Sequence, residues 1–431
     1  MQRLNKYIRL TAAAVMLMAM PQSGTAEDTL VMAMPQSGTA QDTPGTAQDT
    51  AATAQDTAAT APLRFSLLTC TPGTDVYAHF GHTAILMDDG ATGRAVVYNY
   101  GCFDSSQDHF VMNFVKGDTN YMLEEEPLQF FLWRYGQMGN GVTEQQLNLT
   151  ASEALRLKAL LAENVKPVNQ TYLYNWLYDN CTERARDIIE QAVEGQIVYE
   201  GQERTVTARQ MLHEKLVAAP WLRLGIDLLL GQEIDTLAPR RLQMFIPNAY
   251  QAEIDSATIV AADGTRRPLV SQSRLLLAES SRNREVPSPF KPAVMFGLLL
   301  AGILLQSAYD IMHRKLTLWL DVALHTVQGL AGVLIAYLFC FSKHPAVDSN
   351  WQVILLNPLF LGYAIWLAVV TLKGKTNTLA TANLAVTAVF LLLMLAVPQS
   401  FNPSVWLVAL ILLARAITQT ICKTTYTKSN S

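Results

Sequence analysis

The pattern of hydrophobic and polar positions changes near residue 292. Before that point, apolar residues alternate with polar ones or recur at helical spacing. After it come long apolar segments, at 293–309, 316–341, 351–372, 379–397 and 403–422. Each is close to the roughly 20 residues that a helix needs to span a bilayer. The pattern therefore predicts an α+β domain followed by an all-α five-helix transmembrane bundle.

Basic residues follow every second apolar segment. Arg314 and Lys315 come after the first segment, Lys373 after the third and Lys423 after the fifth. Short loops rich in Lys and Arg stay in the cytoplasm. The charges thus predict a cytoplasmic C-terminus and an exported region before residue 292.

The N-terminus is typical of an export signal. Basic residues precede an apolar run at 10–20, and small residues follow up to Ala26. This pattern predicts a signal peptide cleaved after Ala26. A near-copy of residues 18–29 at 32–43 leaves cleavage after Ala40 open, and without a nearby cysteine the mature protein is not expected to be a lipoprotein itself.

Composition agrees with a membrane protein of several parts. The chain has 431 residues, of which 50% are hydrophobic, and a formal net charge of −4. Because no stripe of Lys and Arg is present, nucleic acid is not an expected partner. The predicted organisation is a signal peptide at 1–26, a disordered low-complexity linker at 27–62, a periplasmic domain at 63–291 and the transmembrane domain at 292–431.

A β-hairpin carries the first candidate for chemistry. Strand-forming residues at 80–87 and 95–100 flank a loop rich in Asp and Gly. If Asp88 pairs with Gly93, His82 lies opposite Asn99, on the same face of the sheet. A register slip of one or two residues would replace Asn99 with a neighbour. His79 is a rival base, in a predicted loop.

A cysteine at a predicted helix start is the second candidate. Asn180 suits the N-cap position, and apolar residues recur at helical spacing from Ala185 to Ala192. Cys181 would occupy the first helical position, where the macrodipole and free N–H groups favour the thiolate. The alternative is a cysteine that serves only as a small hydrophobe.

Together these residues are the parts of a papain-like site. Cys181 would be the nucleophile, His82 the base and Asn99 the amide that orients the imidazole. Backbone N–H groups at the helix start would form the oxyanion hole. Arg184, one turn later, would stabilise the thiolate or hold a phosphate or carboxylate, and a solvated surface arginine is the alternative. Asn180 and Tyr98 are further candidates for site support.

Cysteine usage bears on the redox state. The exported region contains Cys70, Cys102 and Cys181, so in an oxidising compartment at least one thiol stays free. A Cys70–Cys102 disulfide is one pairing that leaves Cys181 free. No Cys/His cluster has zinc-site spacing, and neither a metal nor a cofactor is expected.

Several polar residues interrupt the apolar segments or lie between them. Asp321 with Arg415 is predicted to form an ion pair inside the bundle, and His325 a hydrogen bond between helices. The loop residues Asn350, Trp351, Gln352 and Asn402 face outward in the predicted topology and are candidates to meet a lipid headgroup. Asp227 and Asp235 are expected to be structural.

The order histidine before cysteine resembles the circularly permuted papain-like enzymes that include lecithin:retinol acyltransferase. Several linked motifs, from about Leu63 onward, also resemble the Lnb family, which comprises lipoprotein N-acyltransferases with a periplasmic catalytic domain and a membrane domain. The motifs are Leu67–Gly73, Phe80-Gly81-His82-Thr83, Tyr98-Asn99-Tyr100-Gly101, Gly141–Gln145 and Tyr178-Asp179-Asn180-Cys181 with Arg184. Cys102 departs from the family, which more often has a small hydroxyl residue there.

The resemblance implies a fold and a function. The exported domain would be a circularly permuted papain-like α+β domain in the periplasm, on a multi-pass protein of the bacterial inner membrane. Its partners would be a membrane phospholipid or lipoprotein as acyl donor and a diacylglyceryl-cysteine lipoprotein as acceptor. Two alternatives remain: a periplasmic cysteine amidase or peptidase acting on cell-wall peptides, and a non-catalytic lipoprotein-binding membrane protein.

Overall fold

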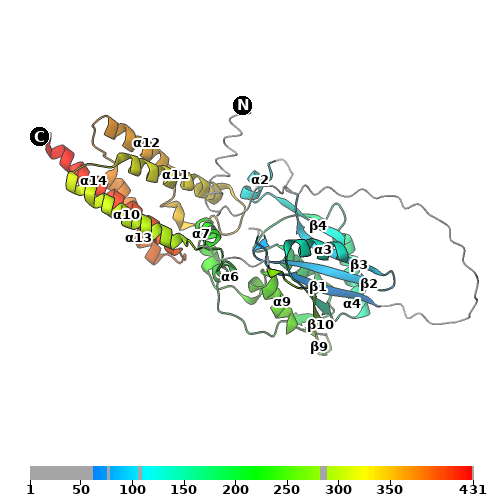
Figure 1. Cartoon of the computed structure of the whole chain (residues 1–431). Coiled ribbons are helices and arrows are strands. Elements are labelled where there is room, and N and C mark those ends of the chain that lie inside the picture. Colours follow the sequence, from blue (N-terminus) through cyan, green and yellow to red (C-terminus); the bar gives the residue numbers. More distant parts are fainter. Residues whose placement is uncertain (1–61, 75–77, 105–108, 282–288, 430–431) are drawn as a thin grey trace, which may run out of the picture. The chain divides into compact units, whose positions relative to one another are not determined.

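A computed structural model describes residues 62–74, 78–104, 109–281 and 289–429 (Figure 1). The predicted signal peptide, its two candidate cleavage positions and the predicted linker up to residue 61 lie outside the described residues.

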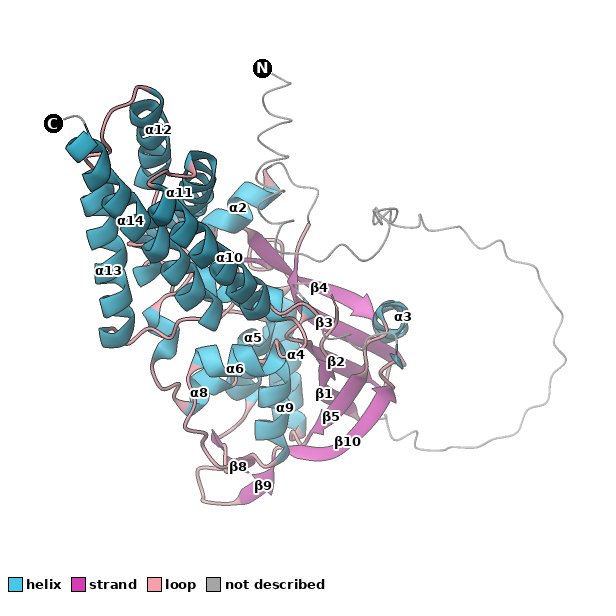
Figure 2. Cartoon of the chain, turned by 60° about the vertical axis from the view of Figure 1, so that its left-hand side comes forward, coloured by secondary structure: helices cyan, strands magenta, loops and turns pink. Residues whose placement is uncertain are grey.

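The N-terminal part of the described chain is built on a seven-stranded sheet of order β10-β5-β1-β2-β3-β4-β6, in which all neighbours are antiparallel. Figure 2 shows β10, β5, β1, β2, β3 and β4 side by side, in that order. The strands are β1 (Leu63–Cys70), β2 (His82–Asp89), β3 (Arg94–Cys102), β4 (Asn120–Pro127), β5 (Val142–Leu147), β6 (Thr171–Leu173) and β10 (Val270–Leu277). A second sheet contains β7 (Gln196–Val198), β8 (Thr258–Val260) and β9 (Arg266–Pro268).

Helices cover both faces of the large sheet because its side chains alternate between two cores. On one face, Leu67, Ile85 and Tyr100 pack with residues of α4 (Ala151–Asn164), α5 (Cys181–Ala192) and α9 (Pro247–Asp255). On the other face, Leu68 and Leu86 pack with residues of α3 (Leu128–Met138). The β-rich N-terminal domain is therefore layered around the central strands β1, β2 and β3.

The hairpin of β2 and β3 forms, but its predicted register is wrong. Asp89 pairs with Arg94 and Asp88 with Ala95, which shifts the register by two residues from the expected pairing of Asp88 with Gly93. The turn explains the shift. The Asp89 carbonyl accepts the Thr92 N–H at 3.1 Å, and Gly93 takes a φ of 66°, so Gly93 belongs to the turn and cannot pair.

The C-terminal part is a helical membrane region. Its helices are α10 (Pro292–His313), α11 (Leu318–Phe341), α12 (Leu359–Leu372), α13 (Ala380–Ala396) and α14 (Pro403–Ser429). In the described chain, three helices are long and apolar enough to cross a membrane: α10, α11 and residues 403–422 of α14. The shorter α12 and α13 have 14 and 17 residues. That these two helices also span the membrane stays a prediction.

The third predicted segment, 351–372, is interrupted. It begins with the short 3-10 helix η4 (Trp351–Val353), and α12 starts only at Leu359. Pro358 immediately precedes α12, where its fixed φ and missing N–H suit a helix start and not an interior. The apolar run therefore contains a turn.

The predicted polar contacts inside the membrane region are confirmed. The Arg415 guanidinium donates two hydrogen bonds to Asp321, at 2.7 and 2.9 Å, and also pairs with Asp310 at 2.9 Å. His325 of α11 contacts the Gln419 side chain of α14 at 3.3 Å. These contacts hold α10, α11 and α14 together.

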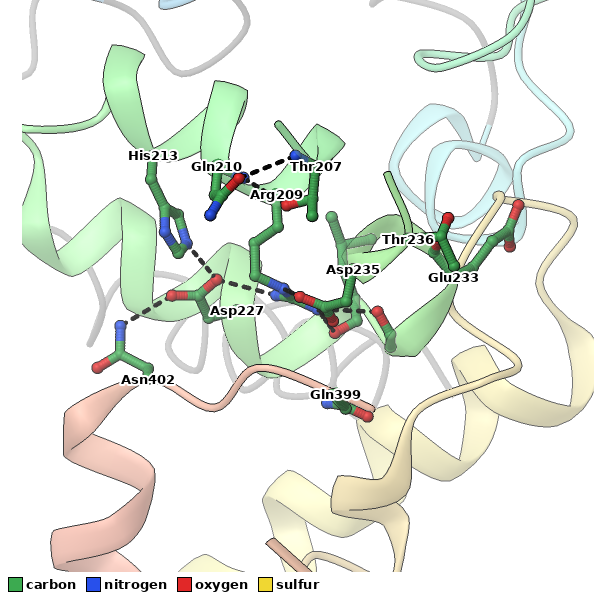
Figure 3. Close-up of polar contacts among 12 residues, drawn as sticks. Thr207, Arg209, Gln210, His213, Asp227, Glu233, Asp235, Thr236, Gln399 and Asn402 are labelled. Atoms are coloured by element: carbon green, nitrogen blue, oxygen red, sulfur yellow. Dashed lines mark hydrogen bonds and ion pairs between the residues drawn. The ribbon is translucent and has the colours of Figure 1, made fainter. Parts of the chain in front are cut away.

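Polar contacts also join the β-rich domain to the membrane region, through α6 (Ala208–Lys215), α7 (Pro220–Leu229) and η2 (Gln232–Asp235) (Figure 3). Asp227 accepts hydrogen bonds from Arg209 at 2.9 Å and from the Asn402 amide at 2.9 Å. Arg209 also bonds Asp235 at 2.8 Å. The structural roles expected for Asp227 and Asp235 are confirmed.

The suggestion that Asn350 and Gln352 meet a lipid headgroup is wrong, and the amide of Asn402 is bonded to Asp227 instead. The Asn350 amide donates to the Leu228 carbonyl at 2.8 Å, and the Gln352 amide to the Asp227 carbonyl at 2.7 Å. Asn350 and Gln352 are each 1% exposed. Carbonyl groups of α7 therefore occupy the hydrogen-bond donors that a headgroup was expected to meet.

Candidate active site

Cys181 is the first residue of α5, where the cap geometry holds it in place. The Asn180 side-chain oxygen accepts the N–H groups of Thr182 and Glu183, at 2.8 and 3.1 Å, so the predicted N-cap is confirmed. The Asn180 amide in turn donates to the carbonyls of Trp176 and Phe245, at 2.9 and 3.0 Å. The helix start is thereby tied to two other segments.

His82 begins β2 and takes part in a chain of hydrogen bonds. Its Nε2 lies 2.6 Å from Oδ1 of Asn99, and the Asn99 amide donates to Glu126 at 2.9 Å. An ionised carboxylate only accepts, so the amide nitrogen of Asn99 must face Glu126 and its oxygen must face a protonated Nε2. Nδ1 of His82 is then the nitrogen left to bond the thiol.

His82 and Asn99 meet although they are not directly opposed. With the observed register continued, Asn99 lies opposite Ala84, two residues from His82. A shift of two residues keeps both side chains on the same face, since strands alternate with a period of two. The contact is therefore diagonal, within the reach of these side chains.

Cys181 and His82 come from opposite faces of the sheet and both lie beside Gly101. By strand alternation His82 points toward α3, where its ring stacks on Tyr135 with centroids 6.1 Å apart. Cys181 instead starts a helix on the other face. A carbon atom added at Gly101, whose φ is 89°, would lie 3.5 Å from Cβ of Cys181 and 3.9 Å from Cε1 of His82. The positive φ is what favours glycine at this position, and the two distances show that Cys181 and His82 border the same point next to Gly101.

The electrostatics favour a thiolate–imidazolium pair. Burial acts to raise the pKa of Cys181, but the charge of His82 and a hydrogen bond from it bring that pKa below the ordinary value. Burial likewise acts to lower the pKa of His82, while the Cys181 thiolate and the hydrogen bonds to Cys181 and Asn99 raise it overall. Each residue therefore stabilises the charged form of the other.

Labelling of Cys181 by iodoacetamide is expected to have a midpoint below the free-cysteine pKa of about 8.5. In His82→Ala the midpoint should move above that value, because burial then acts on the thiol without an opposing positive charge. Labelling at a series of pH values, with mass-spectrometric mapping to Cys181, measures both midpoints. Equal midpoints in the two proteins would show that the residues are not electrostatically paired.

Glu126 and Arg134 were not anticipated from the sequence. Glu126, at the end of β4, accepts a hydrogen bond from Arg134 of α3 at 2.5 Å as well as the one from Asn99. Burial raises the pKa of Glu126, and Arg134 opposes that shift. The two residues reach the site through the pairing of β3 with β4 and the docking of α3, and no local sequence pattern signals either contact.

The candidate disulfide between Cys70 and Cys102 is wrong, since both thiols are free. Cys70 pairs with His82 on β2, and β2 separates β1 from β3, where Cys102 lies. Two strand spacings amount to about 9.5 Å. That separation exceeds the roughly 7 Å between Cα atoms that a disulfide can bridge.

The remaining candidates have different surroundings. Arg184 makes two hydrogen bonds to Asp179, both at 2.6 Å, and its guanidinium lies 3.6 Å from the centre of the Tyr172 ring. The Arg184 side chain is therefore half-buried, and its guanidinium is already paired with Asp179. Tyr98 packs in the hydrophobic core, on the face of β3 opposite Asn99. The rival base His79 is buried in the turn before β2.

The described part of residues 62–429 contains no candidate metal-binding site. No group of three or more His, Cys, Asp or Glu side chains there is arranged to hold a metal ion.

Comparison with known proteins gives two matches to family models. The model of the Lnb N-terminal periplasmic domain matches residues 49–214, which include Cys181, His82 and Asn99. The model of the Lnb transmembrane domain matches residues 283–428. No curated protein and no solved structure matches the chain.

Proposed function

The chain belongs to the Lnb family, and from this premise we propose that it is a lipoprotein N-acyltransferase that works through a Cys181 thioester. The acyl donor would be an ester of a membrane phospholipid or lipoprotein, and the acceptor the N-terminal amine of a diacylglyceryl-cysteine lipoprotein. The observation that carries the proposal is the series of contacts from Cys181 to His82 and from His82 to Asn99. These residues lie in a domain that is joined to a membrane region. The fold of that domain is proposed to be papain-like and circularly permuted.

In the first half-reaction, the Cys181 thiolate attacks the ester carbonyl carbon and a tetrahedral intermediate forms. His82, which holds the thiol proton on Nδ1, passes it to the alkoxide as the C–O bond breaks. The products are a thioester on Cys181 and a free hydroxyl on the donor lipid. Asn99 keeps Nε2 of His82 hydrogen-bonded, so the imidazole presents Nδ1 to the sulfur throughout.

In the second half-reaction, the neutral N-terminal amine of the acceptor attacks the thioester carbonyl. His82, now neutral, takes a proton from the attacking nitrogen, and the C–S bond breaks to release an amide. The thiolate–imidazolium pair is restored. No metal or redox partner is needed for either step.

Glu126 and Arg134 are proposed as positioning residues. Glu126 holds the Asn99 amide at 2.9 Å, which prevents that amide from turning its nitrogen toward His82. Arg134 in turn holds Glu126 from α3. Both residues act through Asn99, so their loss should slow the reaction without removing the nucleophile.

The surroundings of α2 (Phe110–Lys116) support a lipid substrate over a water-soluble peptide. The helix is bound to the segment after α11, through the Lys116 carbonyl with the Lys343 N–H at 2.8 Å and the Phe114 carbonyl with His344 at 2.6 Å. Met112 is 51% exposed. A short helix with exposed apolar residues at the end of a predicted spanning helix is suited to the bilayer surface.

Full-length protein in mixed micelles of detergent and phospholipid is expected to add one acyl chain to a synthetic diacylated lipopeptide. Mass spectrometry of the lipopeptide measures the gain, and an N-acetylated lipopeptide, which has no free amine, is the control that should remain unchanged. Cleavage of cell-wall peptides without acylation would favour the amidase. Binding of the lipopeptide without acylation would favour the non-catalytic alternative, and either result would refute acyl transfer.

A further inference from the structure

We propose that the hydroxyl of Tyr172 is the side-chain donor of the oxyanion hole at Cys181. This inference rests on the proposed function, because it assigns a residue to the tetrahedral intermediates of acyl transfer. Tyr172 would donate a hydrogen bond to the oxyanion and keep its proton throughout, so it takes no part in bond breaking.

Tyr172 has a buried hydroxyl that the fold does not use. It lies in β6, where it pairs with Tyr121 of β4, and it is 8% exposed. Among the residues that the structure describes, its Oη has no hydrogen-bond partner. Burying a hydroxyl without a partner costs free energy. An unsatisfied group of this kind in a folded protein calls for an explanation, such as a role in catalysis.

The hydroxyl faces the space at Gly101. A carbon atom added at Gly101 would lie 3.9 Å from Oη of Tyr172, 3.5 Å from Cβ of Cys181 and 3.9 Å from Cε1 of His82. One point is therefore within 4 Å of the hydroxyl and of atoms of the nucleophile and the base. A reacting carbonyl must be placed where nucleophile, base and oxyanion donor can all reach it.

A side-chain donor is needed because the helix start cannot supply the expected oxyanion hole. The N–H groups of Thr182 and Glu183 are already bonded to the Asn180 side chain. The expectation that several N–H groups of this helix start would hold the oxyanion is therefore wrong. The N–H of Cys181 itself is the helix-start group that can still contribute, and oxyanion holes combine two or more donors.

Arg184 strengthens Tyr172 as a donor. Its guanidinium lies 3.6 Å from the ring centre and is held there by two hydrogen bonds to Asp179. When the Tyr172 hydroxyl donates a hydrogen bond, the phenol group gains partial negative charge. A cation over the face of the ring stabilises that charge. Burial nevertheless raises the pKa of Tyr172 well above its ordinary value, so the hydroxyl stays protonated at neutral pH.

Tyr172→Phe tests the proposal, because it keeps the ring and its contact with Arg184 and removes only the hydroxyl. The turnover rate of acyl transfer should fall by about 10²–10³-fold, the effect of removing one oxyanion donor. The rate at which iodoacetamide alkylates Cys181 should not change, because substitution at a saturated carbon develops no oxyanion. The midpoint of thermal unfolding should stay constant or rise, because the lost hydroxyl had no partner.

Tyr100→Phe is the matched control. The Tyr100 hydroxyl is also buried, but it accepts a hydrogen bond from Asn164 at 2.9 Å. This variant should unfold at a lower temperature and keep its transfer rate, which is the reverse of the result expected for Tyr172→Phe.

Each outcome separates the donor role from the proposed function. Wild-type transfer by Tyr172→Phe, with an inactive Cys181→Ser, would overturn the donor role and leave the proposed function standing. A fall in both the unfolding midpoint and the alkylation rate would show that Tyr172 acts by packing, which also overturns it. Transfer by both Tyr172→Phe and Cys181→Ser would refute the proposed function itself.

Discussion

Cys181→Ser is expected to abolish acyl transfer while the protein still folds. A serine hydroxyl has a much higher pKa than a thiol, so His82 cannot hold it as the anion, and the nucleophile is lost. Removing the nucleophile or the base from such a site lowers turnover by on the order of 10⁶-fold. His82→Ala should show a loss of the same order, and the lipopeptide assay with purified protein measures both.

Cys102→Ser is the matched control, since it makes the same change of sulfur for oxygen near the site. Cys102 donates a weak hydrogen bond to the Asn99 carbonyl at 3.5 Å, which a serine hydroxyl can also make. We expect transfer to persist in this variant. Near-normal transfer by Cys181→Ser, in protein that is correctly inserted, would exclude the covalent mechanism.

Arg209→Ala is expected to produce the largest loss of stability. The Arg209 side chain is 2% exposed and neutralises Asp227 and Asp235, whose side chains are 1% and 3% exposed. Its removal takes the shared arginine from two buried carboxylates, of which Asp227 keeps a contact with His213 at 2.7 Å. Breaking a buried pair in this way costs roughly 3–5 kcal/mol. The midpoint of unfolding in detergent and the yield of folded protein should both fall.

The control for this variant is Arg204→Ala, which breaks the exposed ion pair with Glu214. Exposed ion pairs contribute little because solvent screens them, so this change should leave the unfolding midpoint almost unchanged. Equal midpoints for the two variants would show that the Arg209 cluster is not a stabilising element.

Local sequence patterns predicted the parts of the site that depend on one element or one hairpin. Asn180 marked the helix start, and strand alternation placed His82 and Asn99 on one face even though the register was two residues off. Glu126 and Arg134 could not be predicted, because their contacts arise from the order of strands and the docking of α3. The sequence also does not show that β2 lies between the strands of Cys70 and Cys102, so a disulfide between these two residues was compatible with it.

In the membrane region, hydropathy located the helices but not the surroundings of polar loop residues. Apolar runs indicated all five helices of the region, because burial in lipid or in a bundle demands continuous hydrophobicity. Hydropathy could not show that Asn350 meets the Leu228 carbonyl at the end of α7 or that Asn402 meets the Asp227 carboxylate. Both contacts join segments far apart in the chain. Lipid and a neighbouring domain are equally compatible with a polar residue at the end of an apolar segment.

The interface between α6, α7 and the membrane loops has a consequence for biogenesis. The hydrophobic cluster that contains Leu177 and Met211 is completed by Ala346 and Val347, which the ribosome adds much later. We therefore expect the N-terminal domain to remain incompletely folded until α11 and the loop after it have been synthesised. A chain that terminates early would keep the Asp227 carboxylate and this cluster uncovered and become a substrate for quality-control proteases.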